Sequence, residues 1–162
     1  MKKSKMIIMM GAAGSGKSTK SQLIVAQEKN CIRVNRDRLR EMCYAFHPSR
    51  SKKYWESYDL AEREANITRI EMGFIRSAVE ADCTVVIDNM NVNWNYINRY
   101  VNLAKELNIP YCMKVVDTSL SRCLAQDKAR ERSVGPDLVE RTYYDLKNIM
   151  KDTRFEKIFK PY

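Results

Sequence analysis

Residues 11–18 read Gly-Ala-Ala-Gly-Ser-Gly-Lys-Ser, which matches the phosphate-binding pattern G-x-x-x-x-G-K-[ST]. The apolar run 6–10 precedes this loop and an amphipathic segment follows it, so the loop stands between a strand and a helix. This context favours a nucleotide site over a chance glycine-rich turn. Backbone N–H groups and the helix start can hold phosphate oxygens, while Lys17 reaches the β- and γ-phosphates. We expect ATP to contact Gly14, Ser15, Gly16, Lys17, Ser18 and Thr19.

A second polar group, Asn-Arg-Asp-Arg-Leu-Arg, occupies residues 35–40 after the next strand-like segment. In an open α/β sheet, ligands bind beyond the carboxyl ends of the strands, where this group must emerge. A helix that begins near Asp37 places Asp37 and Arg40 on one face as i,i+3 neighbours. Asp37 is then our candidate catalytic base, and Arg40 our candidate ligand for an acceptor phosphate. The alternative is structural, with Asp37 as a helix cap and Arg40 as a solvated surface residue.

Two more candidates follow the strand-like segment 83–88. Asp88 ends this segment on the ligand side of the sheet, and we expect it to orient water on a Mg²⁺ ion that the Ser18 hydroxyl also binds. Asn91 lies in a run of alternating asparagines. We take Asn91 as a candidate contact to the acceptor, with a role in a turn as the alternative.

A basic segment, 119–132, ends just before Gly135 and Pro136. A basic helix that folds over a nucleotide can neutralise the charge on a transferred phosphoryl group, and such arginines contribute on the order of 10³- to 10⁵-fold in rate. The alternative is a solvated helix face in which these cations pair with Asp127 and Glu131. We expect residues 119–136 to form a helical lid.

Strand-like segments at 6–10, 31–35, 83–88 and 111–117 alternate with helical patterns at 17–28, 37–45, 54–81, 94–107, 119–131 and 136–151. This alternation predicts an α/β fold of the P-loop NTPase type, with three layers and a mostly parallel sheet between helices. The 162 residues are expected to form one domain. Segment 47–53 is predicted to be a basic loop. The aromatic tail 152–162 is predicted to dock on the body, and Trp55, Tyr58 and Trp94 to pack rather than stack on bases.

The chain carries 29 Lys+Arg against 20 Asp+Glu, a net charge of +9. This surplus suits a polyanionic partner such as nucleic acid, with a solvated basic surface as the alternative. Five cysteines without a C-x-x-C pair, together with a single histidine, argue against a zinc site and fit a reducing cytoplasm, the host's if the protein is encoded by a phage. The basic start and the apolar run after it are interpreted as a strand, not a signal peptide. We expect no membrane partner, and the number of subunits is left open.

The chain lacks the guanine-reading Asn-Lys-x-Asp motif and the carboxylate pair typical of ATPase motors. It resembles the kinase domain of phage polynucleotide 5′-kinases over nearly its whole length. The matching pieces are the loop 11–19, the segment 35–40, Ile-Asp-Asn-Met-Asn at 87–91 and the arginine-rich segment that ends at Pro136. The chain departs from that family at Met90, where a threonine is usual, so a hydroxyl contact is missing.

The resemblance implies a role for three residues. The residue matching Asp37 activates the 5′-hydroxyl, and that matching Arg40 contacts the acceptor phosphate. The residue matching Arg130 clamps the donor phosphates, and we choose it over Arg132 because it lies six residues before Pro136, as in the family. The resemblance thus predicts a kinase that moves the ATP γ-phosphate to the 5′-hydroxyl of DNA or RNA. The alternatives are a kinase of a small metabolite, nucleoside or antibiotic, and a non-catalytic ATP-binding regulator.

Overall fold

The computed structural model describes residues 4–45 and 52–162. Within them, four parallel strands form one sheet in the order β2-β3-β1-β4. The strands are β1 (Met6–Met10), β2 (Cys31–Val34), β3 (Thr84–Ile87) and β4 (Tyr111–Val115). The helices are α1 (Lys17–Gln27), α2 (Arg36–Tyr44), α3 (Lys52–Trp55), α4 (Leu60–Glu80), α5 (Trp94–Glu106), α6 (Leu120–Lys128), α7 (Pro136–Lys151) and α8 (Thr153–Ile158). The predicted α/β fold with a parallel sheet is confirmed.

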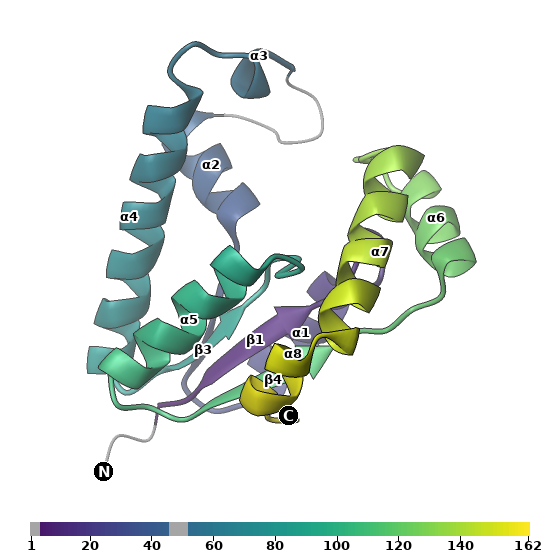
Figure 1. Cartoon of the computed structure of the whole chain (residues 1–162). Coiled ribbons are helices and arrows are strands. Elements are labelled where there is room, and N and C mark those ends of the chain that lie inside the picture. The colour runs from purple at the N-terminus through teal and green to yellow at the C-terminus, as the bar shows by residue number, and fades with distance from the viewer. Residues whose placement is uncertain (1–3, 46–51) are drawn as a thin grey trace.

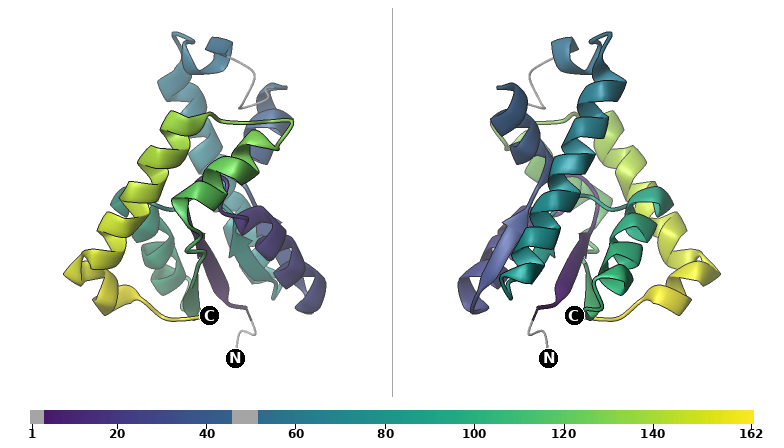
Figure 2. Two further views of the ribbon diagram at one scale, coloured as in Figure 1. Left: turned by 90° about the vertical axis from the view of Figure 1, so that its right-hand side faces the viewer. Right: turned by 90° about the vertical axis from the view of Figure 1, so that its left-hand side faces the viewer.

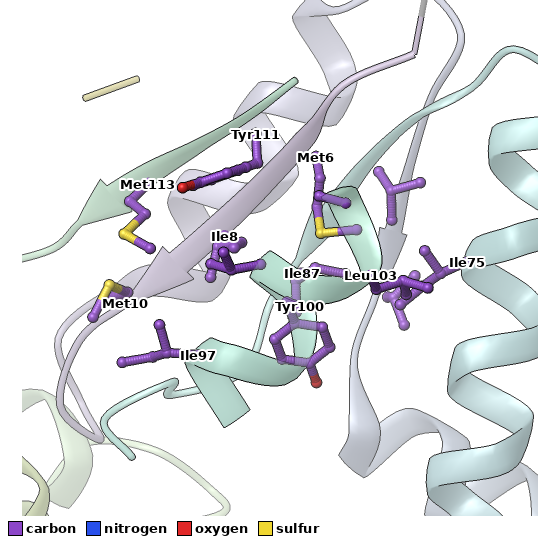
Figure 3. Close-up of a cluster of buried hydrophobic side chains, with 14 of the residues drawn as sticks. Met6, Ile8, Met10, Ile75, Ile87, Ile97, Tyr100, Leu103, Tyr111 and Met113 are labelled. Carbon is purple, nitrogen blue, oxygen red and sulfur yellow. The ribbon is translucent and has the colours of Figure 1, made fainter. Parts of the chain in front are cut away.

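Strand β1 is apolar and buried at every position. A strand of this kind lies in a sheet whose two faces are both covered by helices. Side chains alternate along a strand, so Met6, Ile8 and Met10 point to one face and enter the core formed with α4, α5 and α7 (Figure 3). Ile7 and Met9 point to the other face and pack against Ile24 and other α1 residues. The right-hand view of Figure 2 shows α1 on one side of the sheet and α5 on the other.

The parallel strands end at one edge of the sheet, and this edge carries the polar groups. The chain leaves β1 into the phosphate-binding loop, β2 into α2, and β3 into Asp88. In Figure 1, α2 and α4 rise on one side of this edge, and α6 and α7 on the other. Only β3 separates β1 from β2, so the two strand ends lie about 10 Å apart.

The predicted helix 54–81 is wrong, because it is broken into α3 and α4 by a turn at residues 56–59. Ser57 Oγ donates to the carbonyl of Tyr54 at 2.6 Å, and Asp59 Oδ2 accepts from Arg63 Nε at 2.8 Å. In the Ser57 bond a short polar side chain competes for a backbone carbonyl, and such competition ends helices. Most of the predicted loop 47–53 lies outside the described residues, and its last two residues begin α3.

Of the two aromatic residues before and within this turn, only Tyr58 fails to pack as predicted. Tyr58 is fully exposed, whereas Trp55, although 44% exposed, meets the Tyr54 ring edge-on at 5.1 Å and has the Arg40 guanidinium 5.0 Å from its own ring. Trp94 is half-buried, with the Arg154 guanidinium 4.3 Å from its ring. The packing predictions for Trp55 and Trp94 are therefore confirmed, and the one for Tyr58 is wrong.

The tail does dock on the body, although it forms an unpredicted helix, α8. Phe155 enters the main core and stacks on Phe159 at 4.8 Å between ring centres. Beyond α8, the backbone pairs with the edge strand β4: Met113 N–H donates to the Lys160 carbonyl at 2.6 Å, and Tyr162 N–H to the Met113 carbonyl at 3.1 Å. The tail thereby covers one edge of the sheet. Within 4–45 and 52–162, no helix is long and apolar enough to cross a membrane.

Candidate active site

The phosphate-binding loop has the backbone that its glycines allow. Gly14 and Gly16 have φ angles of 75° and 90°, in the left-handed region, and Gly16 caps α1. Lys17 lies buried at the start of α1, and its Nζ donates to the Ala12 carbonyl at 2.7 Å across the loop. Ser15 is buried, whereas Ser18 and Thr19 are exposed. The residues predicted for ATP therefore lie in one glycine-rich turn and in the first turn of α1.

Helices α6 and α7 hold the outer side of the loop. Ala13 N–H donates to Thr142 Oγ1 at 3.0 Å, and Thr118 Oγ1 donates to the Ser15 carbonyl at 2.8 Å. A Cβ atom at Gly14 would collide with the Cys123 carbonyl, so α6 approaches the loop backbone as closely as glycine permits. The body of the predicted lid is thus packed on the loop rather than separate from it.

The segment between α6 and α7 carries Arg130 and Arg132, both exposed. Buried Asp127 organises this segment by accepting hydrogen bonds from Ser133 Oγ at 2.7 Å and Gly135 N–H at 3.1 Å. Arg130 Nη1 lies 3.7 Å from Asp127 Oδ1. One buried carboxylate therefore fixes the turn that presents Arg130.

The charges around Lys17 link this turn to the loop. Burial lowers the pKa of Lys17 to about 8, the negative charge of Asp88 opposes this change, and the positive charge of Arg130 adds to it. Asp88 and Arg130 therefore both act electrostatically on the lysine that we assign to the phosphates.

Asp37 and Arg40 lie on one face of α2, as the spacing predicts. The cap of α2 is Asn35, whose Oδ1 accepts from Arg38 N–H at 3.0 Å, so Asp37 is not the cap. The side chain of Asp37 is 56% exposed and that of Arg40 only 9%. Arg40 Nη1 donates to Asp37 Oδ1 at 2.7 Å. Both structural alternatives, a capping aspartate and a solvated arginine, are wrong.

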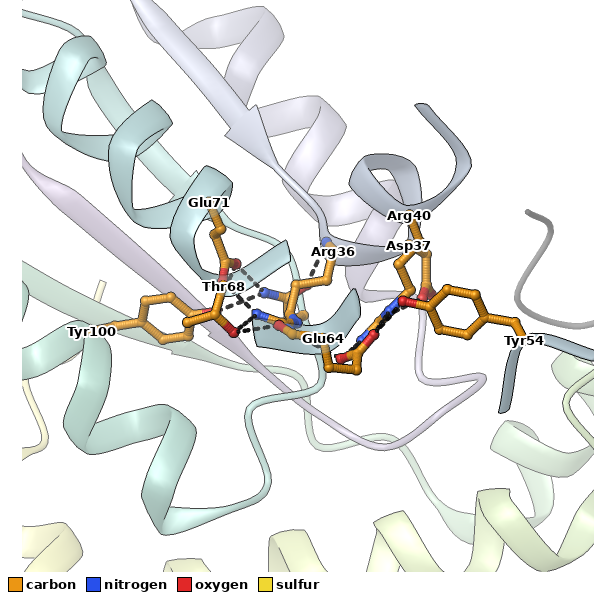
Figure 4. A network of polar contacts seen from close by, with 9 residues as sticks. Arg36, Asp37, Arg40, Tyr54, Glu64, Thr68, Glu71 and Tyr100 are labelled. Atoms are coloured by element: carbon orange, nitrogen blue, oxygen red, sulfur yellow. Dashed lines mark hydrogen bonds and ion pairs between the residues drawn. The ribbon is translucent and has the colours of Figure 1, made fainter. Parts of the chain in front are cut away.

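Glu64 of α4 holds Arg40 in place (Figure 4). Arg40 Nε and Nη2 donate to the two Glu64 oxygens at 2.7 and 2.8 Å, and Tyr54 Oη donates at 2.7 Å. Burial raises the pKa of Glu64, but the hydrogen bonds from Arg40 and Tyr54 outweigh burial and bring it down to about 2. A carboxylate that is ionised at neutral pH thus fixes the Nε and Nη2 side of the Arg40 guanidinium.

Arg36 joins this network to the core. It donates to Glu64 at 3.0 Å and to fully buried Glu71 at 2.8 Å. Glu71 also accepts from Tyr100 Oη at 2.7 Å, and burial, followed by the charge of Glu71, raises the pKa of Tyr100. Arg36 N–H donates to Asn89 Oδ1 at 3.0 Å, so the network ties the start of α2 to the end of β3. The network therefore joins Arg36 and Glu64, and through Glu64 also Arg40, to the core of the protein.

Asp88 has the surroundings that a metal-orienting carboxylate needs. Its exposed fraction is 2%, and its Oδ1 has no hydrogen-bond partner among the described residues. The described residues contain no cluster of three or more His, Cys, Asp or Glu that could hold a metal ion by themselves. A Mg²⁺ ion here would rely on nucleotide phosphates, with one carboxylate and the Ser18 hydroxyl, which is a usual arrangement for Mg²⁺. The residues present fit that ion.

Asn91 takes a structural position. It is 3% exposed with φ of 52°, and its Nδ2 donates to the Met9 carbonyl at 2.6 Å. Its side chain therefore joins the end of β1 to the turn after β3. The contact to an acceptor stays a prediction.

Our reading of the sequence missed the residues that support this site, above all Glu64, Glu71 and Arg33. Glu64, Thr68 and Glu71 recur at i, i+4 and i+7, the spacing of one helix face, beside buried Ile67. When carboxylates occur on the helix face that packs on the core, they indicate that buried cations contact that face. Arg33 carries no comparable local signal.

Comparison with known proteins places this geometry in a family. The model of the AAA domain matches residues 6–151. A viral protein from Autographa californica nuclear polyhedrosis virus, named as a bifunctional polynucleotide kinase/RNA ligase, is 23% identical over 93% of this chain and 22% of its own length. A chain of the Pnkp1/Rnl/Hen1 RNA repair complex is 26% identical with a TM-score of 0.76, over 98% of this chain and 48% of that one.

This chain thus spans about a fifth of the viral relative and about half of the repair-complex chain. Deoxyadenosine kinase from M. mycoides, with a TM-score of 0.51 and 16% identity, shares the fold alone. The matched region begins at β1 and ends at the last residue of α7, so it includes the phosphate loop and every other candidate site residue. The chain belongs to the AAA domain family.

Proposed function

We propose that this chain is an ATP-dependent polynucleotide 5′-hydroxyl kinase. The observation that carries the proposal is the Asp37–Arg40 pair, fixed by Glu64 at the sheet edge that also bears the phosphate-binding loop. A base and a cation held together beside a triphosphate site suit transfer to an alcohol whose own strand is anionic. We treat residues 1–162 as one kinase domain.

In the proposed step, a carboxylate oxygen of Asp37 takes the proton of the 5′-hydroxyl. The hydroxyl oxygen forms a bond to the γ-phosphorus while the bond from that phosphorus to the β,γ-bridging oxygen breaks, and ADP leaves. Asp37 suits the base role because its side chain is 56% exposed and its Oδ2 has no hydrogen-bond partner among the described residues. Arg40 binds the first phosphate of the acceptor strand, and catalysis rests on positioning and charge.

On the donor side, Lys17 and Arg130 neutralise the β- and γ-phosphates. Residues 14–19 cradle them, and Ser18 and Asp88 serve the Mg²⁺ ion, which when bound neutralises charge on the phosphates. Because α6 is packed on the loop, we assign lid motion to residues 129–135, which present Arg130.

Three further facts support a nucleic-acid acceptor. The chain has a net charge of +9. The viral relative is named as a polynucleotide kinase/RNA ligase, and the structural relative belongs to an RNA repair complex. A separate observation concerns the compartment and not the acceptor: the five cysteines are free, which fits a protein that works in a reducing cytoplasm.

The test is incubation with γ-labelled ATP and a panel of 5′-hydroxyl oligonucleotides, nucleosides and sugars. We expect label at the 5′ ends of oligonucleotides, DNA or RNA, and an oligonucleotide affinity that falls steeply with salt because several phosphates are contacted. Label in a nucleoside or sugar alone would identify a small-molecule kinase. ATP binding without label in any acceptor would identify a regulatory protein. Either result would overturn the proposal.

A further inference from the structure

Asp88 is paired with an arginine that our sequence analysis did not single out. Arg33 Nε and Nη2 both reach Asp88 Oδ2 at 2.6 Å. Arg33 lies one residue before the end of β2, opposite Val86 in the neighbouring strand β3. Val86 points to the face of the sheet that α1 covers. Because residues paired across parallel strands point to the same face, Arg33 also lies on the α1 face of the sheet.

The pairing leaves the two oxygens of Asp88 in different states. Oδ2 receives both hydrogen bonds from the guanidinium, whereas Oδ1 is buried with no partner among the described residues. The carboxylate also acts on the charge of Lys17, so it lies within electrostatic reach of the nucleotide lysine. A buried acceptor atom without a partner is costly and calls for a ligand or water.

We propose that Arg33 tunes the metal affinity of the nucleotide site: it holds the Asp88 carboxylate by Oδ2, leaves Oδ1 for water on the ion, and offsets the charge of the carboxylate. The inference rests on the metal role proposed for Asp88. It explains why an arginine, 23% exposed, stands beside a carboxylate that serves a cation. A carboxylate already paired with a guanidinium attracts Mg²⁺ less strongly, which keeps the ion with the phosphates that leave with ADP.

The rival explanation is that Arg33 only compensates a buried charge. A buried ion pair can serve stability alone, and losing one partner then destabilises the fold. The two explanations differ in what they predict for metal affinity, because loss of the Arg33 charge strengthens ion binding through Asp88 only if the Asp88 carboxylate serves the ion. Stability measurements alone do not separate them.

The experiment is a titration of Mn²⁺, followed by its electron paramagnetic resonance signal, into protein held in excess over a non-hydrolysable ATP analogue. Arg33→Gln retains a hydrogen-bond donor but removes the charge, and we expect it to bind Mn²⁺ at least about fivefold more tightly than the unchanged protein. Arg33→Lys retains the charge and should remain within about twofold of the unchanged protein.

Two controls make the result specific. Arg38→Gln removes one positive charge from an arginine whose side chain is 62% exposed and paired with Glu41 rather than with Asp88, and it should leave Mn²⁺ affinity unchanged. In an Asp88→Asn background, the gain from Arg33→Gln should be smaller than in the unchanged protein, since only the direct repulsion between the guanidinium and the ion remains. Unfolding by urea without ligand verifies that each variant is folded.

Unchanged or weaker Mn²⁺ binding by Arg33→Gln would overturn the inference, as would an equal gain in Arg38→Gln. If Arg33→Gln does not fold, Arg33→Lys and Arg33→Met decide: affinity raised in Met and not in Lys supports the inference, and equal affinity in both refutes it. The titration needs no acceptor. A chain that labels no polynucleotide can still pass this test, so the two failures are distinguishable.

Discussion

Arg40 Nη1 donates a 2.7 Å hydrogen bond to Asp37 Oδ1 on the same helix face, so the cation assigned to the acceptor also holds the carboxylate assigned as base. An acceptor phosphate that binds Arg40 is thereby brought beside Asp37. The pair does not depend on α2 alone, because Glu64 of α4 accepts hydrogen bonds from the other two guanidinium nitrogens of Arg40, Nε and Nη2. Base and acceptor cation therefore form one unit, and their substitutions should not act independently.

The first prediction concerns the base. Asp37→Ala should lower the rate of phosphoryl transfer by about 10²- to 10⁴-fold, because no carboxylate remains to take the hydroxyl proton. ATP affinity, measured by calorimetry without acceptor, should stay close to that of the unchanged protein. Glu41→Ala removes a half-buried carboxylate one turn further along α2 and serves as the matched control. If Asp37→Ala retains most of its rate, Asp37 is not the base.

A second prediction addresses the support of Arg40. Glu64→Gln keeps the shape of the side chain but loses the charge that fixes the guanidinium. We expect KM for the oligonucleotide to rise about tenfold while KM for ATP changes less than twofold, because the phosphate-binding loop belongs to other elements. Steady-state kinetics with each substrate varied in turn measures both constants. An equal rise in both would argue for general loosening of the fold instead.

The same residue governs a third prediction, on acid stability. The folded-state pKa of Glu64 is about 2, below its ordinary value of 4.5, so its ionisation stabilises the fold above pH 4.5 and this contribution is lost as pH falls toward 2. Glu64→Gln should therefore lower the free energy of unfolding by about 2–3 kcal/mol at pH 7. The difference between the two proteins should shrink at pH 3. Urea titrations at both pH values check this, and a difference that does not depend on pH would contradict it.

A fourth prediction separates two neighbouring arginines. Arg130 acts on the charge of Lys17 and lies beside Asp127, whereas Arg132 does neither. Arg130→Ala should lower kcat by about 10³-fold or more, with a modest change in ATP affinity. Arg132→Ala, which removes the same charge two residues away, should lower kcat less than threefold. Similar losses in both variants would mean that the segment contributes only general positive charge.

The fifth prediction uses two glycines. Gly14→Ala should destabilise the fold by about 2 kcal/mol and weaken ATP binding, because alanine is strained at φ of 75° and its Cβ would displace the Cys123 carbonyl of α6. Gly73→Ala is the control, because Gly73 lies on α4 with open space around its Cα. That change should stabilise the protein by about 0.5–1 kcal/mol. Thermal unfolding with and without ATP measures both effects.

The local features of this chain were readable from the sequence. The loop 11–18, the unbroken apolar strand β1 and the i,i+3 pair Asp37 and Arg40 depend on residues close together in the chain, so their spacing defines their geometry. The alternation of strands and helices likewise predicted a parallel sheet, because parallel strands need a crossover between them. The break at residues 56–59 and α8 were missed, since short polar turns and six-residue helices carry weak periodicity.

Only the tertiary structure decided which distant residues support the site. Glu64 meets Arg40 across 24 residues, and Asp88 meets Arg33 across 55. The contact between Gly14 and Cys123 of α6 joins residues that are more than a hundred positions apart in the sequence. Such partners are set by the order of strands in the sheet and by the docking of helices on it, and a one-dimensional pattern does not contain that order. The sequence therefore determined the chemical groups of this protein, whereas the fold determined which of them are buried, paired and held still.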